Sequence, residues 1–183
     1  MKWWTVGTLA LAASCASTTA QHRQVRESFE AWRDAAAAGD VEKVLRGMTP
    51  AFRSEWVFRL LTAGDPEAQE WRIRLAGTPA RTDLDLWLEH QKKYAQGRPE
   101  VLPATVLSHP TLEPLLLGYL NREREALKHE FSGLTVTEVY LDETGATVTV
   151  QNRLKQPEMY ELVPAPGGWM INGHRRPLRP LPR

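Results

Sequence analysis

His90 and Tyr94 are the residues of this chain whose types and spacing come nearest to acid–base chemistry. They are four positions apart, so a helix places them side by side on one face, and Asp83 lies about two turns upstream. An imidazole beside a phenol and a carboxylate can act as general acid and general base. The competing interpretation is a helix on which His90 is partly exposed and Tyr94 covers the core. We favour it, because nothing in the sequence shows polar groups converging on one point.

No other pattern of catalytic or metal-binding residues stands out. The chain has no G-x-S-x-G, no H-E-x-x-H, no phosphate-binding loop and no dinucleotide fingerprint. Its single cysteine, Cys15, excludes an intramolecular disulfide and a cysteine-based metal cluster. The 23 Lys and Arg residues nearly balance the 22 Asp and Glu residues, which argues against nucleic-acid binding. We therefore expect neither a metal nor a cofactor.

The start of the chain has the composition of a targeting segment. Lys2 precedes a short apolar run, Trp3–Ala13, that is too short to span a bilayer comfortably. The run ends in Leu11-Ala12-Ala13-Ser14-Cys15, which resembles the lipobox of bacterial lipoproteins. The match departs at Ala12, where leucine is commonest in that family. The alternative is ordinary cleavage after Ala20, which would give a soluble periplasmic or secreted protein.

The lipobox resemblance implies that Cys15 becomes the acylated N-terminus of a protein of the bacterial cell envelope. The residue after the cysteine is Ala16 and not aspartate. In the sorting pattern of this family, that implies the outer membrane, on its periplasmic side, if the host has one. Each buried methylene of an acyl chain contributes about 0.8 kcal/mol, so two or three chains anchor durably. The membrane is thus one expected partner, reached through the N-terminal lipid.

Apolar residues at helical spacing occupy much of the chain between residues 22 and 130. We expect helices at His22–Ala38, at Val41–Gly47, after the capping pair Thr49-Pro50, from the capping pair Asp65-Pro66 to Gly77, from Thr82 or Asp83 to Gly97, and at Thr111–His129. Gly39 is expected to end the first helix and Asp40 to cap the second. Residues 98–110 hold three prolines and are expected to form a loop, with Val101–Leu107 as a candidate edge strand.

The residues from 131 to 173 predict a four-stranded antiparallel β-meander. The clearest strand alternates with period two, and the residues expected on its buried side are Ala146, Val148, Val150 and Leu154. Before this strand, a hairpin loop at 142–145 is expected, in which Gly145 takes a positive φ. The last strand is expected to place Trp169 and Ile171 in the core.

These expectations divide the 183 residues into three parts. Residues 1–20 form a signal peptide with the lipobox at Cys15 and a short tether. Residues 21–173 form a single α+β domain, with helices at 22–130 and the meander at 131–173. Residues 174–183 form a basic, proline-rich tail, whose prolines favour an extended conformation over a helix.

Two stretches of the domain resemble the nuclear transport factor 2-like superfamily, also called the SnoaL or ketosteroid-isomerase-like fold. The residues that carry the resemblance are Phe29-Glu30-Ala31-Trp32, Ala38-Gly39-Asp40, Val44-Leu45, Thr49-Pro50-Ala51-Phe52, Ala146-Thr147-Val148-Thr149-Val150, Tyr160-Glu161-Leu162 and Gly167-Gly168-Trp169-Met170-Ile171. The resemblance implies N-terminal helices packed on the C-terminal meander as a cone around a pocket. Between Asp65 and Glu130 the chain departs from it with a helical insertion, where the superfamily usually has an early strand pair. The alternative is a helical bundle laid on a lone meander.

Two classes of function follow from the residues and the resemblance. The first is a non-catalytic envelope lipoprotein that binds a small apolar ligand or another envelope component through a cone-shaped pocket or the sheet face. Candidate pocket residues are Trp56, Trp87 and Tyr160, although core packing also explains tryptophans on apolar helix faces. The second is a pocket enzyme of isomerase or dehydratase type that uses His90 and Tyr94. The absence of a convergent acid–base set favours the first.

Overall fold

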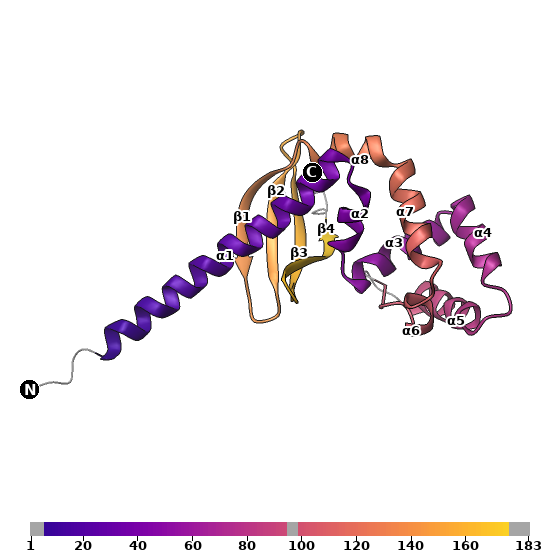
Figure 1. The fold of residues 1–183 in the computed structure, drawn as a ribbon, viewed down its shortest axis with the longest axis horizontal. Helices are drawn as coiled ribbons and strands as arrows, with labels where there is room; N and C mark the ends of the chain where they lie inside the picture. The colour runs from indigo at the N-terminus through magenta and orange to yellow at the C-terminus, as the bar shows by residue number, and fades with distance from the viewer. Residues whose placement is uncertain (1–5, 95–98, 176–183) are drawn as a thin grey trace, which may run out of the picture.

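The computed structural model describes residues 6–94 and 99–175, with side chains from residue 19 onward. Within these residues the helices come first and a four-stranded antiparallel sheet follows, so the fold is α+β, as predicted (Figure 1). The helices are α1 (Val6–Ala38), α2 (Val41–Arg46), α3 (Pro50–Thr62), α4 (Pro66–Arg74), α5 (Pro79–Tyr94), α6 (Ala104–Leu107), α7 (Leu112–Arg122) and α8 (Arg124–Phe131). The strands are β1 (Thr135–Leu141), β2 (Ala146–Gln151), β3 (Pro157–Ala165) and β4 (Gly168–Arg175), in the order β1-β2-β3-β4.

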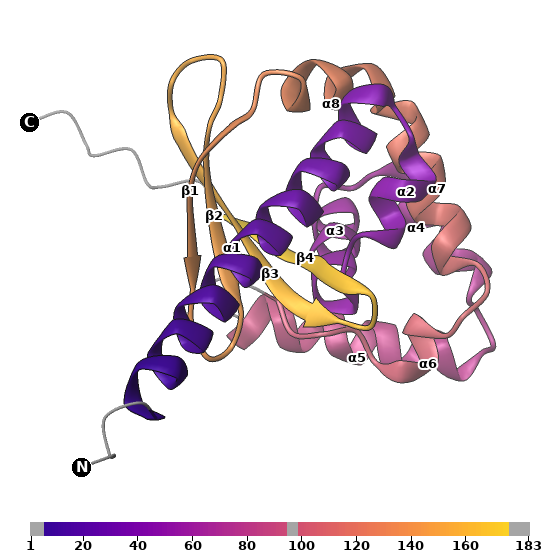
Figure 2. The same cartoon turned by 60° about the vertical axis from the view of Figure 1, so that its left-hand side comes forward.

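Helix α1 crosses one face of the sheet, and its N-terminal part extends beyond the sheet (Figures 1 and 2). Val25, Phe29, Trp32 and Ala36 are buried on one side of it and face the sheet and helices α2 and α8. The helix begins at Val6, well before the predicted start at His22. The reason is local: the segment before His22 is rich in alanine, which has the highest helix propensity. It contains no proline, and its one glycine, Gly7, lies at the start of the helix.

The predicted caps at three helix starts are confirmed. Gly39 ends α1 with φ 75°, and Asp40 accepts a hydrogen bond from the Lys43 amide to begin α2. The Thr49 hydroxyl accepts from the Phe52 amide, and the Asp65 carboxylate accepts from the Ala68 amide. Each cap satisfies a backbone N–H that the first helical turn leaves without a partner.

Two helix predictions and one strand prediction in the middle of the chain differ from the structure. Helix α5 begins at Pro79, ahead of Thr82, because the Thr78 hydroxyl accepts from the Arg81 amide and caps the first turn. The candidate edge strand at Val101–Leu107 is wrong. Residues 104–107 form α6, whose amides at Val106 and Leu107 bond to the Pro103 carbonyl. The predicted helix at 111–129 is divided into α7 and α8 where the backbone turns at Glu123.

The sheet buries the face that alternation predicted on β2. Ala146, Val148 and Val150 are buried, while Thr147 and Thr149 between them are half-buried. Leu154 does not belong to that face, because β2 ends at Gln151 and Leu154 is 75% exposed in the following turn. Asn152 makes this turn: its carboxamide oxygen accepts from the Leu154 and Gln156 amides, which bends the chain away from the strand direction.

Gly145 takes part in the β1–β2 turn in a different way from the one expected. Its φ is not positive, and the glycine is needed because a Cβ atom there would lie 2.5 Å from the Leu162 carbonyl oxygen of β3. Asp142 organises the same turn, since its carboxylate accepts from the amides of Thr144 and Gly145.

The last strand differs from the prediction at both of its ends. Ile171 is buried as expected, but Trp169 is only half-buried and packs at the margin of the core. The strand also continues to Arg175, so His174 and Arg175 belong to the sheet and not to the tail. The remainder of the predicted tail, 176–183, lies outside the described residues.

The outer edge of β4 is covered by the connection between α2 and α3. The Ile171 amide donates to the Gly47 carbonyl at 2.8 Å, and the Thr49 amide donates to the Ile171 carbonyl at 2.9 Å. The Thr49 side chain adds a hydrogen bond to Asn172. These contacts fasten the start of α3 to the sheet and so set the position of α3 relative to β4.

Candidate functional site

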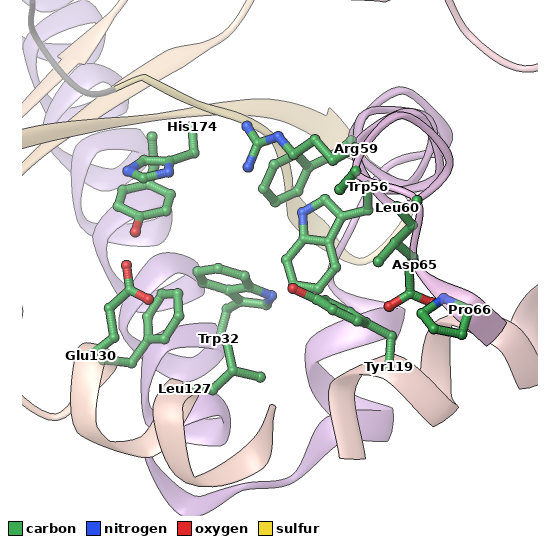
Figure 3. A pocket seen from close by; sticks show the side chains of 15 residues that line it. Trp32, Trp56, Arg59, Leu60, Asp65, Pro66, Tyr119, Leu127, Glu130 and His174 are labelled. Atoms are coloured by element: carbon green, nitrogen blue, oxygen red, sulfur yellow. The ribbon is translucent and has the colours of Figure 1, made fainter. Parts of the chain in front are cut away.

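A cavity of about 670 Å³ lies where α3, α7 and α8 meet the helix α1 and the end of β4 (Figure 3). Its volume is in the range of small-molecule binding sites. Its wall draws on segments from across the chain, and the residues that line it are Trp32, Phe52, Trp56, Arg59, Leu60, Ala63, Gly64, Asp65, Pro66, Tyr119, Leu127, Glu130, Phe131, Tyr160 and His174.

Aromatic rings form two groups in the cavity wall. In the first, the Trp32 ring packs edge-on against Phe131 at 5.1 Å between centroids and lies 5.8 Å from Tyr160. In the second, the rings of Trp56 and Tyr119 meet edge-on at 5.6 Å. Edge-on and tilted packing of this kind stabilises aromatic groups in fixed positions. The cavity is therefore walled by rings that the core itself holds in place.

The indole of Trp32 is fixed by its own hydrogen bond. Its Nε1–H donates to the Val44 carbonyl of α2 at 3.0 Å, and the residue is 6% exposed. Gly47 permits this arrangement, because a Cβ atom there would lie 2.5 Å from the Trp32 ring. The α1–α2 corner thus positions one aromatic wall of the cavity.

A histidine and a buried glutamate stand at one end of the cavity. His174 Nε2 lies 2.9 Å from Glu158 Oε2, and the other carboxylate oxygen of Glu158 accepts from the Asn152 carboxamide at 2.9 Å. The imidazole also stacks on the Tyr160 ring, with centroids 4.4 Å apart and planes 14° apart. The β3–β4 register, which pairs Tyr160 with His174, brings these groups together.

Charged groups line the other end of the cavity. The Asp65 carboxylate pairs with Arg122, whose second terminal nitrogen contacts Glu67 at 2.7 Å. The guanidinium of Arg122 also lies over the Tyr119 ring. Burial, with the charge of Glu123, raises the pKa of Tyr119, so its hydroxyl stays protonated at neutral pH and can donate a hydrogen bond.

Of the three candidate pocket residues, the structure brings Trp56 and Tyr160 to the same cavity and places Trp87 elsewhere. Trp87 is buried on α5, where its indole donates to the Glu100 carbonyl at 3.2 Å and its ring meets Phe58 edge-on. Trp87 is therefore a core residue, which is the alternative that the sequence analysis gave for tryptophans on apolar helix faces.

His90 and Tyr94 do not line this cavity. Their rings lie 5.0 Å apart, as the helical spacing predicted, but both side chains face outward. The expectation that Tyr94 covers the core is wrong, because Tyr94 is 58% exposed. Gln91 takes the inward position instead and bonds to the Glu100 amide. Asp83 accepts a hydrogen bond from Thr105, on the same exposed side of the domain.

His174 and Glu158 are among the site residues that the sequence did not predict, as are Arg59 and Tyr119. Glu158 alternates with Tyr160 and Leu162 on the inward side of β3, and a glutamate in such a row is a signal of a buried carboxylate with a partner. His174 was assigned to the tail because basic and proline residues follow it directly.

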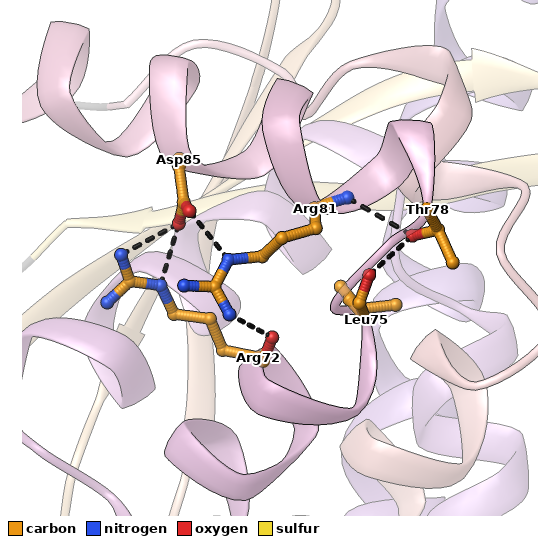
Figure 4. Close-up of polar contacts among 5 residues, drawn as sticks. All are labelled: Arg72, Leu75, Thr78, Arg81 and Asp85. Carbon is orange, nitrogen blue, oxygen red and sulfur yellow. Dashed lines mark hydrogen bonds and ion pairs between the residues drawn. The ribbon is translucent and has the colours of Figure 1, made fainter.

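A second polar cluster lies away from the cavity and joins α4 to α5 (Figure 4). Asp85 accepts from Arg72 at 2.7 Å and from Arg81 at 2.6 Å, and Arg81 also donates to the Arg72 carbonyl. Thr78 extends the cluster by bonding to the Leu75 carbonyl. All these partners are on α4, α5 and the turn between them, so we interpret the cluster as a structural clamp.

Two searches of the described residues bear on other classes of function. No helix among them is long and apolar enough to cross a membrane. No group of three or more His, Cys, Asp and Glu side chains in that part of the chain is arranged to hold a metal ion.

Comparison with known proteins finds no match: no family model, no curated protein and no solved structure matches this chain. The likeness to the nuclear transport factor 2-like superfamily therefore stays a prediction from the residues quoted above.

Proposed function

We propose that this chain is a lipid-anchored protein of the bacterial envelope whose α+β domain binds a small apolar ligand without transforming it. The observation that carries the proposal is the cavity of about 670 Å³ walled by two groups of aromatic rings. Ring faces and edges held in place before a ligand arrives reduce the entropy lost on binding. An apolar ligand of two or three fused rings fits the size and chemistry of this cavity.

The ligand-binding proposal is tested with N-phenyl-1-naphthylamine, a neutral dye whose fluorescence rises in apolar surroundings. We expect saturable binding at one site per chain. Ala63→Trp should abolish it, because Ala63 lies at the cavity wall and is exposed, so the larger side chain enters the cavity without disturbing the core. Thr62→Trp is the matched control, since Thr62 is the exposed neighbour that does not line the cavity. Equal binding by the two variants would refute the proposal.

Anchoring through Cys15 is the second part of the proposal. Cys15 lies within α1, in the part of the helix whose side chains are not described. The lone cysteine at the end of a short apolar leader supports it. Cys15→Ser should abolish the membrane-bound mature form in cell fractionation. Mass spectrometry of the wild-type protein decides the matter: a mature chain that begins at Gln21 and carries no acyl groups would refute anchoring.

The His174–Glu158 pair favours a second candidate, a pocket enzyme of isomerase or dehydratase type. A carboxylate only accepts, so in the neutral imidazole Nε2 carries the proton toward Glu158, and Nδ1 is then the basic nitrogen. A basic nitrogen at a cavity wall can abstract a proton from a bound substrate. This pair replaces His90 and Tyr94 as the site on which such an enzyme would depend. Turnover of a cyclic ketone by the wild type that is lost in His174→Gln would favour catalysis over binding alone.

A further inference from the structure

We propose that the ligand of this cavity is an organic anion, with a flat apolar body and a carboxylate that pairs with Arg59. This inference rests on the proposed binding function and names the chemical class of the ligand. It comes from an inventory of which charged groups at the cavity are already neutralised by the protein.

The protein supplies its own partners for Asp65, which lines the cavity, and for Glu158, which bonds to the lining residue His174 but does not itself line the cavity. Asp65 accepts from the Ala68 amide and pairs with Arg122. Glu158 is 4% exposed and is bonded through both oxygens, to Asn152 and His174. Binding a cation through either of them would require the ligand to compete with contacts that are already made.

Arg59 is in a different situation. Its contact with Glu55, one turn earlier on α3, spans 3.8 Å, which is longer than a hydrogen bond. The Arg59 side chain is 63% exposed. It donates no hydrogen bond to another described residue. Guanidinium donors in a fork match the two oxygens of a carboxylate. Arg59 is therefore the charged donor at the cavity wall that a ligand can reach.

Two neutral donors stand on the same side of the cavity as Arg59. Figure 3 places the Trp56 indole nitrogen next to Arg59 and the Tyr119 hydroxyl beside the Trp56 ring, on the side of the cavity opposite Glu130. The Tyr119 hydroxyl is protonated at neutral pH, as tyrosine ordinarily is, and so can donate. A carboxylate at this end meets the Arg59 cation and two N–H or O–H donors, and Asp65, a carboxylate that also lines this end, is already paired with Arg122.

Attraction to Arg59 gives the ligand one orientation. Figure 3 draws Glu130 on the opposite side of the cavity from Trp56 and Tyr119. A ligand carboxylate is attracted by the exposed Arg59 guanidinium, so the anion points to Arg59. The apolar body then lies between Trp32 on one side and Trp56 on the other, in the space that the aromatic rings leave.

The experiment is displacement of N-phenyl-1-naphthylamine by three ligands of one shape and different charge: 2-naphthoate, 2-naphthamide and 2-naphthylmethylammonium. In the wild type we expect 2-naphthoate to bind about fivefold more tightly than the amide, which reflects a charged hydrogen bond weakened by exposure to solvent. The ammonium compound should bind least. The preference for 2-naphthoate should shrink as sodium chloride is raised, because Arg59 is partly exposed.

Substitutions assign the preference to one residue. Arg59→Gln should remove the preference, so that naphthoate and naphthamide bind equally, and Arg59→Lys should keep part of the preference. Arg74→Gln is the matched control: Arg74 forms the same i,i+4 pair with a glutamate, at 3.6 Å and with 65% exposure, but does not line the cavity. Unfolding midpoints of the variants show that the domain stays folded.

The outcomes separate this inference from the binding function beneath it. If the compounds displace the dye but 2-naphthoate binds no more tightly than 2-naphthamide, the anion assignment is overturned. The same holds if the ammonium compound binds most tightly. In both cases the cavity is still a binding site. A naphthoate preference that survives Arg59→Gln also overturns the anion assignment. Failure of the dye and of all three compounds at millimolar concentration overturns both proposals.

Discussion

Asp85→Asn tests whether the α4–α5 clamp stabilises the domain. The substitution keeps the size of the side chain and removes its charge. Two arginines then lose their shared carboxylate, which in the structure accepts hydrogen bonds at 2.6 and 2.7 Å. Ion pairs at a protein surface contribute about 0.2–1 kcal/mol each, and this carboxylate is one third exposed. Both ion pairs are short, and Arg72 contacts the carboxylate through two of its nitrogens. We therefore expect a loss of about 1–2 kcal/mol in the free energy of unfolding at pH 7.

The same substitution gives a signature in pH. Burial alone would raise the pKa of Asp85, but hydrogen bonds and charge from Arg81 and Arg72 outweigh it and hold the pKa below the ordinary value. The pKa is therefore lower in the folded state than in the unfolded chain. Stabilisation by this carboxylate is complete above the unfolded value of about 3.9 and is lost as the pH falls through the folded value. The difference between wild type and Asp85→Asn should be constant from about pH 7 to pH 5 and should shrink below about pH 4.

Urea denaturation followed by tryptophan fluorescence measures both effects. Glu70→Gln is the control, because Glu70 pairs with Arg74 on the surface of the same helix α4, at 3.6 Å and with 67% exposure. It should change the midpoint only slightly. The reasoning fails if Asp85→Asn costs no more than Glu70→Gln, or if its cost does not change with pH.

Three further substitutions test other features of the fold, each against wild type. Gly145→Ala should cost about 1–3 kcal/mol, measured by urea denaturation, because the new Cβ meets the Leu162 carbonyl at 2.5 Å; a silent substitution would show that the β1–β2 turn yields easily. Trp169→Ala should cost about 1–2 kcal/mol, less than the 3–5 kcal/mol or so expected of the fully buried Trp71→Ala, and the reverse order in midpoints would contradict the burial of the two side chains. His90→Ala should leave the unfolding midpoint and N-phenyl-1-naphthylamine binding unchanged, since His90 is exposed and distant from the cavity wall; a loss of dye binding would place it at the site.

The parts of the fold that depend on neighbouring residues were predictable from the sequence. A cap is decided within one helical turn, so Asp40, Thr49 and Asp65 were identified with their roles. The β2 alternation is equally local, and it predicted the buried face correctly as far as Val150. Gly145 failed as a prediction because its constraint comes from another strand, β3, and not from its own turn.

The orientation of α5 shows where helical spacing stops being a guide. Successive residues are about 100° apart, so Gln91 lies within about 20° of Leu84, and Tyr94 lies within about 20° of the buried Trp87. Spacing alone therefore assigns both residues to the inward side. Gln91 is buried there, but Tyr94 is the last residue of α5 and is exposed, so the inward row ends before it.

The cavity itself depends on contacts that no local pattern contains. Trp32 comes from α1, Trp56 from α3, Tyr119 from α7 and His174 from β4. Their meeting depends on the cover of β4 by the α2–α3 connection and on the β3–β4 register. The sequence showed that aromatic residues were available, and only the tertiary packing decided which of them share a cavity.

The two edges of the sheet differ in what they offer to another chain. In the middle of β4 the backbone groups of Ile171 are already bonded to Gly47 and Thr49, so a foreign strand cannot pair with that part of the edge. At β1, the described part of the chain supplies no neighbour on the side away from β2. Fibre growth by strand addition requires each arriving chain to present a second open edge. Because the β4 edge is blocked at its centre, association of these domains through their strands should favour pairs joined at β1 over filaments.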